Sequence, residues 1–490
     1  MRAVFACLFL VLLSACSVGP DADTLRTDVN ERLEQALHSR VVELASLTRR
    51  GSQSDTKAPA GEQRRIIYFD AELKLTQDLN FGAWNAPGIA GLISALGAAP
   101  KGIDGITSGG NKAGDIIRAH GTALYRHDGQ AWVAVMPAGY QPPVAPEYVR
   151  APTGAGAMLA GLRKVVEAIP RDISPVQQAA IEEELAVAQA SIRARLARVS
   201  NGYAIAAGAE HGQYLRLARA VFNERNSRAV PLITRGGEEN LQLLRAGKVS
   251  LALAQGDAAL DAYEGAGTFS GRGPYGDLRA IASLYPEPMH VLVRADGSLT
   301  SIRGLRGKRV AIGEVGSASR TTALRVLGAH GLGLDDINAQ ELSIGAALLW
   351  LQQGKTDAVF QVIGTPADSI RDSLRDMSLR LLPLSGDAIT KLTHGKTGYF
   401  PHTISKGTYF NQNEDVQTLA TAALLLTNET LSDAEVESIT GRVFQQGSDY
   451  SARGSAQGAQ ISVATSRIGV LVPMHAAAAR KLDSLAASMP

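Results

Sequence analysis

The chain has 490 residues, with 49 Lys and Arg against 47 Asp and Glu and a formal net charge of +2. This near-balance gives no electrostatic footprint for nucleic acid, and the length predicts two to four domains. The only two cysteines, Cys7 and Cys16, are too few for a Cys/His metal cluster. We therefore expect no nucleic acid partner, no metal site and no cofactor.

The first residues predict an exported protein. Residues 1–15 combine a basic Arg2, an apolar run from Ala3 to Leu13 and small residues, which is typical of a secretory signal peptide. The end of this segment also resembles a bacterial lipobox, which implies cleavage before Cys16 and lipidation of its thiol. An ordinary cleaved signal is the alternative, but a lone thiol is a liability in an oxidising compartment. We expect a periplasmic protein with a lipid anchor at Cys16.

Residues 16–137 are expected to form an anchor segment and a small domain. Apolar residues at helical spacing between Thr24 and Arg50 predict an amphipathic helix, and 51–63 has the composition of a linker. Residues 64–137 predict a small β-rich domain. Its strands are expected at 64–75 and 121–136, the second as a hairpin about His127-Asp128-Gly129.

Residues 138–200 predict a connector rich in Pro and Gly, followed by a helical spacer. Helices are expected over Met158–Ile169 and Ser174–Val199. Ser174 followed by Pro175 is typical of an N-cap with proline at the first helical position.

From Asn201 onward, short apolar strands alternate with amphipathic helices, which predicts an α/β fold with a largely parallel sheet. The expected strands are 203–208, 230–234, 250–255, 309–313 and 357–363, and the expected helices are 211–224, 239–247, 320–331 and 346–354. Two segments of this region, 243–255 and 350–362, share a helix that ends in Gly-Lys and a buried strand soon after. This similarity favours a chain built from two related α/β lobes.

Several ordered segments resemble one known family. They are 234–257, 263–271, 278–296, 304–327, 379–389 and 407–421, and they include "TRGGEENLQLLRAGKVSLALAQGD" and "GLRGKRVAIGEVGSASRTTALRVL". Residues from about 201 to 490 resemble the TAXI branch of TRAP-transporter solute receptors. The resemblance implies an α/β, bilobed periplasmic-binding-protein fold (type II-like), with an amino-terminal helical and β-rich extension. Lobe 1 would comprise 201–290 and 400–490, and lobe 2 would comprise 291–399.

Ligands of open α/β sheets bind beyond the carboxyl ends of strands, so we take the polar groups there as candidates. The expected ligand-binding residues are Gly208, His211, Tyr214, Arg235, Gly236, Gly237, Gln255, Tyr285, Glu287, Ser317, Ala318, Ser319, Arg320, Gln361 and Thr365. The family usually has a Gly-Thr/Ser-Gly-Gly-rich loop before the tyrosine, where this chain has Glu210 and His211. His211 is therefore either a ligand contact or an exposed residue at the start of a helix.

Three of these candidates carry specific chemistry. Arg235 offers a planar cation that can clamp a carboxylate. Glu287 lies between two prolines that restrict the backbone, so it either holds a ligand ammonium group or braces the hinge. The glycine turn before the helix 320–331 offers backbone N–H groups to an anion, and the resemblance places ligand contacts at Ser317 and Ser319.

We expect no enzyme and no catalytic residues, because the chain has no nucleophile elbow, Walker loop, zinc-protease motif or dinucleotide fingerprint. The resemblance implies capture of a small organic anion, a dicarboxylate or an acidic amino acid such as glutamate, for delivery to the membrane subunits of a TRAP permease. The alternative is a periplasmic sensor that signals to a membrane partner. Ser17 after the lipidated cysteine favours the outer membrane over the inner one.

Overall fold

The computed structural model describes residues 19–37, 41–56, 58, 61–79, 81, 92–93, 95–98, 102–107, 110–135, 174–210, 212–222, 229–373, 378–410, 412–445 and 450–488. The predicted signal peptide, Cys16, the helix 158–169 and His211 lie outside these residues, so they stay predictions. Among the described helices, none combines the length and the hydropathy that crossing a bilayer requires.

A small domain at the amino-terminal end packs helix α2 (Ala22–Leu37) against an antiparallel sheet. The helix precedes five strands: β1 (Val42–Ser54), β2 (Arg64–Leu75), β3 (Ile103–Asp104), β4 (Ile116–His127) and β5 (Trp132–Ala134). The sheet order is β1-β2-β4-β3, and β5 pairs with β4. Leu25, Val29, Leu33 and Leu37, spaced four residues apart, bury one side of α2 in the core that the sheet residues form.

Two predictions for this region are wrong, and two are confirmed. The helix expected over 24–50 ends at Leu37, and residues 42–54 form β1, which pairs antiparallel with β2. Residues 51–54 therefore belong to the sheet and not to a linker. Val42 and Leu44 fit an alternating pattern as well as a helical one, and both are buried in the domain core. The strand 64–75 and the hairpin that pairs Trp132 with His127 are confirmed.

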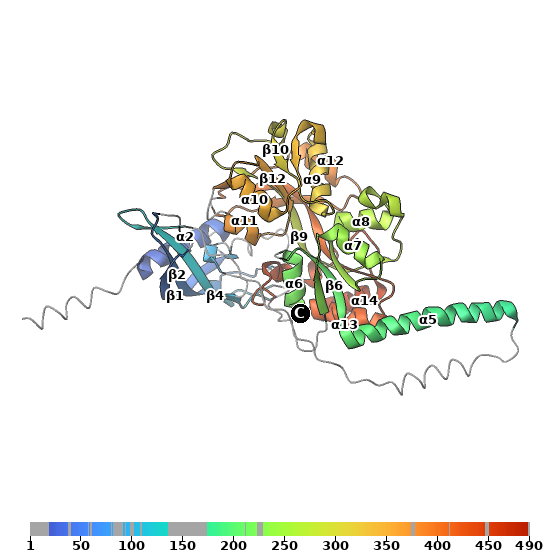
Figure 1. Cartoon of the computed structure of the whole chain (residues 1–490). Helices are drawn as coiled ribbons and strands as arrows, with labels where there is room; N and C mark the ends of the chain where they lie inside the picture. The colour runs from blue at the N-terminus through green and yellow to red at the C-terminus, as the bar shows by residue number, and fades with distance from the viewer. Residues whose placement is uncertain are drawn as a thin grey trace, which may run out of the picture.

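Helix α5 (Pro175–Asn201) confirms the second predicted spacer helix. Ser174 is its N-cap, Pro175 occupies the first helical turn, and the Gln177 side chain completes a capping box. The helix extends away from the rest of the molecule (Figure 1). It is fastened near its end by Arg198, whose guanidinium donates to both carboxylate oxygens of Glu435 at 2.8 and 3.1 Å.

This ion pair predicts a pH-dependent stability. The Arg198 guanidinium and the Ser432 N–H and hydroxyl hold the pKa of Glu435 at about 2, against the desolvation that burial imposes. The pair therefore stabilises the fold above the ordinary glutamate pKa and loses its effect as pH falls toward 2. Glu435→Gln is expected to lower the free energy of unfolding at pH 7 by about 1–3 kcal/mol, allowing for solvent screening.

Urea denaturation at pH 7 and at pH 3 measures this effect. The difference between wild type and Glu435→Gln is expected to shrink by more than half at pH 3. Glu437→Gln, a more exposed carboxylate of the same helix, serves as the control and should change little. An equal loss at both pH values would contradict the role of ionised Glu435.

The remaining residues form an α/β body around one ten-stranded sheet of order β11-β10-β12-β9-β15-β8-β6-β7. On one side of the centre lie β6 (Tyr203–Gly208), β7 (Ala229–Ile233) and β8 (Leu251–Gln255), with α6 (Gln213–Val221), α7 (Gly237–Arg245), α8 (Gly256–Glu264), α13 (Asp433–Val443) and α14 (Ala476–Ala487). On the other lie β10 (Arg309–Ala311), β11 (Asn338–Gln340), β12 (Ala358–Val362) and β13 (Leu379–Leu381), with α9 (Ala318–Ala329), α10 (Ile344–Gln352), α11 (Asp368–Ser373) and α12 (Gly386–Thr393). We call these lobe 1 and lobe 2; Figure 1 shows them as two stacked parts of the body.

Two long strands join the lobes. β9 (Leu278–Arg294) and β15 (Val416–Asn428) pair antiparallel, and each contributes residues to the cores of both lobes. β14 (Phe400–Ile404) pairs with the lobe-2 end of β15. Short 3-10 helices complete the chain: η2 (Gly267–Arg272), η3 (Ile302–Leu305), η4 (Leu334–Asp336), η5 (Ala456–Gln460) and η6 (Val463–Thr465). The predicted α/β, bilobed fold is confirmed.

The two similar sequence segments adopt the same local structure, one in each lobe. α7 ends at a turn with Gly247 at φ +64°, and α10 ends at a turn with Gly354 at φ +65°. In each turn the next lysine donates its backbone N–H across the helix end, Lys248 to Leu243 and Lys355 to Trp350. Each turn leads directly into a buried strand, β8 or β12.

Candidate functional site

The loops that follow the strands of the two lobes lie face to face. A Cβ placed on Gly236, after β7 of lobe 1, would lie 3.8 Å from Ser317 Cα, before α9 of lobe 2. A Cβ on Gly316 would lie equally close to the Arg235 guanidinium carbon. Two loops that the sequence predicts as ligand-binding are therefore brought together between the lobes.

Hydrogen bonds and ion pairs hold the lobes against one another. The Gln213 side chain on α6 donates to the Gly364 carbonyl at 2.7 Å and accepts from the Gly364 N–H at 2.8 Å. The Thr321 hydroxyl donates to Glu238 at 2.6 Å. These contacts join α6 and α7 of lobe 1 to the end of β12 and to α9 of lobe 2, so the two lobes contact one another directly.

Charged pairs also join the lobes along this contact. We call the contact between lobe 1 and lobe 2 the seam. Arg325 on α9 pairs with Asp261 on α8 at 2.5 Å. At the other end of the seam, Asp368 on α11 pairs with Arg216 of α6 and also with Arg371 of its own lobe at 2.6 Å. Arg371 is only 1% exposed, so Asp368 is the counter-charge of a buried cation.

At the centre of the seam lies a cluster of buried polar groups on adjacent strands. Ala423 of β15 pairs with Gln255 of β8 on one side and with Tyr285 of β9 on the other. Two residues beyond Tyr285, Glu287 accepts a hydrogen bond from the Tyr214 hydroxyl at 2.5 Å. Burial raises the pKa of Glu287 to about 8, so this carboxyl is largely protonated at neutral pH.

Asp257, directly after β8, completes this cluster. Its Oδ2 accepts from the Tyr399 hydroxyl at 2.6 Å and from the Thr322 hydroxyl at 3.0 Å. Burial and the Asp257 charge raise the pKa of Tyr399 well above its usual value. Asp257 thus links lobe 1 to the start of α9 and to the segment before β14.

Three polar atoms of this cluster are buried and have no hydrogen-bond partner among the described residues. They are Gln255 Oε1, Asp257 Oδ1 and the Tyr285 hydroxyl oxygen. Two of the three can only accept, and a tyrosine hydroxyl can donate or accept. Buried polar atoms are normally paired, so this group is short of hydrogen-bond donors.

The predicted cations of the site are already paired within their own lobes. Arg235 is 60% exposed and pairs with Glu239. Arg320 pairs with Glu341 at 2.7 Å. The Arg235 guanidinium lies beside Gly316 of lobe 2, whereas that of Arg320 contacts Glu341 of its own lobe, and in both cases the charge is offset by a neighbouring carboxylate.

Several predicted contacts hold the site's own loops in place. Ser317 is the N-cap of α9, and its hydroxyl accepts from the Arg320 N–H. Ser319 is buried, and its hydroxyl accepts from Gln361 Nε2 and the Val362 N–H, which fastens α9 to β12. The other predicted positions are also placed near the seam: Gly208 beside the Tyr214 ring, Gly237 beside Gln255 Oε1, buried Ala318 on α9, and Thr365, whose carbonyl accepts from Gln460.

Other seam residues were not anticipated from the sequence. They are Gln213, Glu238, Asp257, Asp261, Thr321, Thr322, Arg325, Asp368 and Tyr399. Asp257 could have been predicted as a site residue, because it lies two residues after the end of a predicted strand. Tyr399 could not, because its contact with Asp257 joins residues 142 positions apart.

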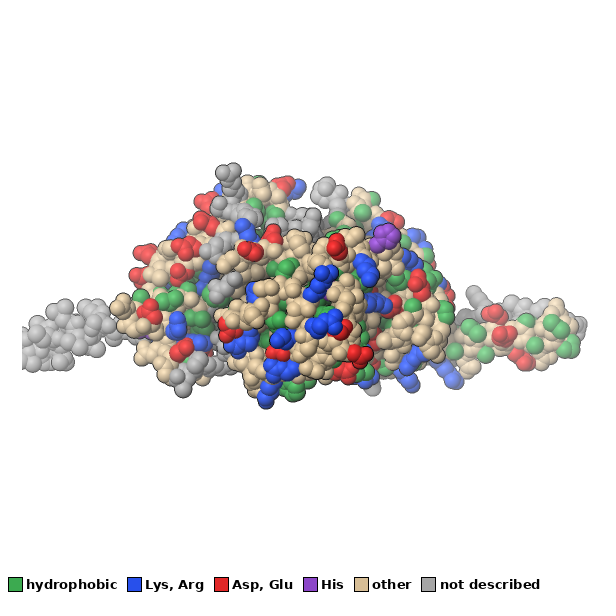
Figure 2. All heavy atoms as spheres, turned by 90° about the horizontal axis from the view of Figure 1, so that it is seen from above, with side chains coloured by type: hydrophobic (Ala, Val, Ile, Leu, Met, Phe, Trp, Pro, Cys, Tyr) green, Lys and Arg blue, Asp and Glu red, His purple; other side chains and the backbone are tan. Residues whose placement is uncertain are grey.

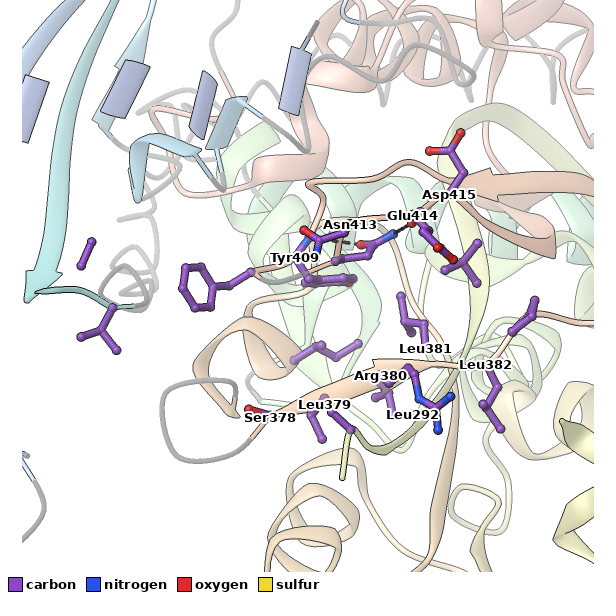
Figure 3. Close-up of a pocket in the computed structure, with 18 of the residues that line it drawn as sticks. Leu292, Ser378, Leu379, Arg380, Leu381, Leu382, Tyr409, Asn413, Glu414 and Asp415 are labelled. Atoms are coloured by element: carbon purple, nitrogen blue, oxygen red, sulfur yellow. Dashed lines mark hydrogen bonds between the residues drawn. The ribbon is translucent and has the colours of Figure 1, made fainter. Parts of the chain in front are cut away.

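A hollow lies away from the seam, between the small β domain and lobe 2. It is a cavity of about 930 Å³ whose apolar wall includes Leu292, Leu381 and Tyr409 (Figure 3). Val133 of β5 lines it from the small domain. On the outer surface seen in Figure 2, acidic and basic side chains are interspersed, as the near-zero net charge predicts.

The body is distantly similar to solved structures of binding proteins. It matches the periplasmic aliphatic sulphonate binding protein SsuA from Escherichia coli with 18% identity and a TM-score of 0.34, over 59% of this chain and 79% of that one. It also matches a binding protein component of an ABC phosphonate transporter from Pseudomonas aeruginosa with 11% identity and a TM-score of 0.35, over 53% of this chain and 79% of that one.

A family model gives the firmer assignment. The model of the NMT1-like family matches residues 205–483, which is more than half of the chain. The match begins in β6 and ends in α14, so it includes both lobes and the seam between them. The chain belongs to the NMT1-like family.

Proposed function

We propose that this protein is a solute-binding lipoprotein of a TAXI-type TRAP transporter, located in the periplasm and anchored through Cys16. It captures a small solute between its lobes and delivers it to a membrane permease, without chemical change. The observation that carries this proposal is the buried polar cluster at a seam between two lobes that share two long strands. Such an architecture converts ligand binding into a change of shape that a membrane partner recognises.

Between the two solute classes that the resemblance implies, the seam favours an amino acid over a dicarboxylate. Gln255 Oε1, Asp257 Oδ1 and the Tyr285 oxygen lack donors, and a ligand ammonium group supplies three N–H donors. Arg235 and Arg320 are already paired, so a dicarboxylate without an ammonium group, which brings two uncompensated negative charges, finds little free positive charge in their guanidiniums. One carboxylate is accommodated by backbone N–H groups of the glycine turns before α7 and α9.

The alternative function is sensing, in which the same closed state is read by a membrane signalling partner. Both functions require ligand capture at the seam, so a binding experiment tests what they share. Cell fractionation tests the anchor: we expect the protein in the outer membrane, as Ser17 favours. Recovery in the inner membrane or as a free periplasmic protein would remove that part of the proposal.

A thermal-shift panel on the full chain tests the solute class. L-glutamate is expected to raise the melting temperature, since a ligand at 100 times its Kd adds about 2.7 kcal/mol of stability. Glutarate, which is L-glutamate without the ammonium group, serves as the matched dicarboxylate, while methanesulfonate and inorganic phosphate represent other anions. A shift with glutarate but none with any amino acid would contradict the ammonium site.

Tyr285→Phe separates binding from folding. Its hydroxyl is buried without a partner, so its removal is expected to leave the ligand-free protein equally stable or more stable. The same variant is expected to weaken amino acid binding at least tenfold, as measured by calorimetry. A stable variant with unchanged affinity would remove Tyr285 from the site.

A further inference from the structure

Helix α5 presents a face that the described residues of the body do not cover. It has 27 residues and is about 40 Å long. Arg198 is its buried residue, whereas Leu196 is 38% exposed. Ile181, Leu185 and Ile192 are partly exposed. Figure 1 shows the helix extending from its contact with the body, so most of its length meets no other described element.

An apolar stripe runs along this helix at the spacing of a coiled coil. It consists of Ile181, Leu185, Ala188, Ile192 and Leu196, which are three or four residues apart. Successive residues of a helix turn by about 100°, so Arg198 lies roughly 120° around the helix from the middle of the stripe. The contact with the body therefore leaves the stripe accessible.

The charges beside the stripe change sign along the helix. Glu182 and Glu184 lie in its first half, and Arg193 and Arg195 lie in its second half. By helical geometry, Glu184 and Arg195 lie on one flank of the stripe, and Glu182 and Arg193 lie on the other. Each flank is thus acidic at one end and basic at the other.

We propose that α5 dimerises with α5 of a second copy of this chain, in antiparallel orientation. An antiparallel pair places the acidic end of each flank against the basic end of the same flank in the other copy. A parallel pair would place acid against acid and base against base. The charge pattern therefore favours a second copy as the occupant, and it fixes the orientation.

One alignment satisfies the apolar and the charged positions together. Centred between Ala188 and Gln189, it opposes Leu185 to Ile192 of the other copy and Ile181 to Leu196. The same alignment brings Glu184 close to Arg195 and Glu182 close to Arg193 of the other copy, each pair offset by two residues, or about 3 Å along the helix axis. Ala188 then lies beside the two-fold axis, where its small side chain allows the two helices to approach closely.

Sedimentation equilibrium of the full chain tests the proposal, with Cys7→Ser and Cys16→Ser to prevent lipidation and disulfides. We expect a reversible dimer. Glu182→Arg with Glu184→Arg makes both flanks of the stripe basic, and Arg193→Glu with Arg195→Glu makes both flanks acidic. Each double variant is expected to raise the dimer Kd at least tenfold, and an equimolar mixture of the two is expected to form a heterodimer.

Glu183→Arg, on the side away from the stripe, is the matched control and should dimerise like the wild type. Leu185→Cys and Ile192→Cys variants test the orientation. Mixed and oxidised, they should form a disulfide with each other, whereas each alone should not. A protein that stays monomeric at all concentrations would overturn the proposal; this is the result expected if another segment of the same chain covers the stripe. Efficient crosslinking of Leu185→Cys alone would also overturn it.

Discussion

Replacing Asp368 by asparagine is expected to lower the free energy of unfolding by about 3–5 kcal/mol, because it leaves a buried cation without its counter-charge. Asp368 pairs with Arg371, which is only 1% exposed, and with Arg216 of the opposite lobe. Nε and Nη1 of Arg371 have no hydrogen-bond partner among the described residues, so no other acceptor there compensates the loss.

Urea denaturation of wild type and Asp368→Asn at pH 7 measures this loss. Asp296→Asn is the matched control, because Asp296 also pairs with an arginine but both side chains are largely exposed. The control is expected to change stability by less than about 1 kcal/mol. If both variants lose equally little, the Arg371–Asp368 pair does not hold a buried charge.

Glu287→Gln is expected to stabilise the ligand-free protein at alkaline pH. Burial raises the pKa of Glu287 to about 8 from its ordinary value of 4.5, so the folded state keeps a proton that the unfolded state releases. The free energy of unfolding is therefore not reduced by Glu287 below pH 4.5, where the carboxyl is protonated in both states. It falls as pH rises from 4.5 toward 8. Glutamine resembles the protonated acid, still accepts from Tyr214, and does not titrate.

The expected gain of Glu287→Gln is small at pH 5 and on the order of 3–5 kcal/mol at pH 9. Melting temperatures between pH 5 and pH 9 measure it, with Glu435→Gln as the variant of opposite sign, since the pKa of Glu435 is lowered to about 2. A gain that does not vary with pH would show that Glu287 is not the titrating group.

Much of the body was predictable because its local signals agree with its tertiary structure. The strands β6, β8 and β12 are short apolar runs, and they are buried as central strands should be. Gly247 and Gly354 end helices in a backbone conformation that favours glycine. Where a signal of this kind exists, the sequence alone identified the element.

The boundary between α2 and β1 was missed for a physical reason. Val42 and Leu44 continue the apolar spacing of the helix, but the adjacent β2 offers a pairing partner over the whole of β1. Pairing of two strands depends on a tertiary contact, and an apolar pattern of a few residues does not distinguish it from another helical turn.

The candidate site was predictable only in part. The strand-end rule identified Gln255, and the two prolines around Glu287 drew attention to Tyr285 and Glu287, which lie within β9 and not at a strand end; the three residues lie on neighbouring strands of the central sheet. The rule did not show that Arg235 and Arg320 pair with nearby glutamates, because such pairing depends on side-chain geometry. The prediction of an arginine clamp for an organic anion therefore gives way, in our proposal, to a site that is short of donors.

The ladder between β9 and β15 has a mechanical consequence. Its register shifts between Ala423 and Leu424 and again between Leu425 and Leu426, immediately beside the row that contains Gln255 and Tyr285. A bulged strand is bent, and its local twist is increased. The lobes are therefore joined by a ribbon that bends beside this row, and any change in that bend would change the angle between the lobes.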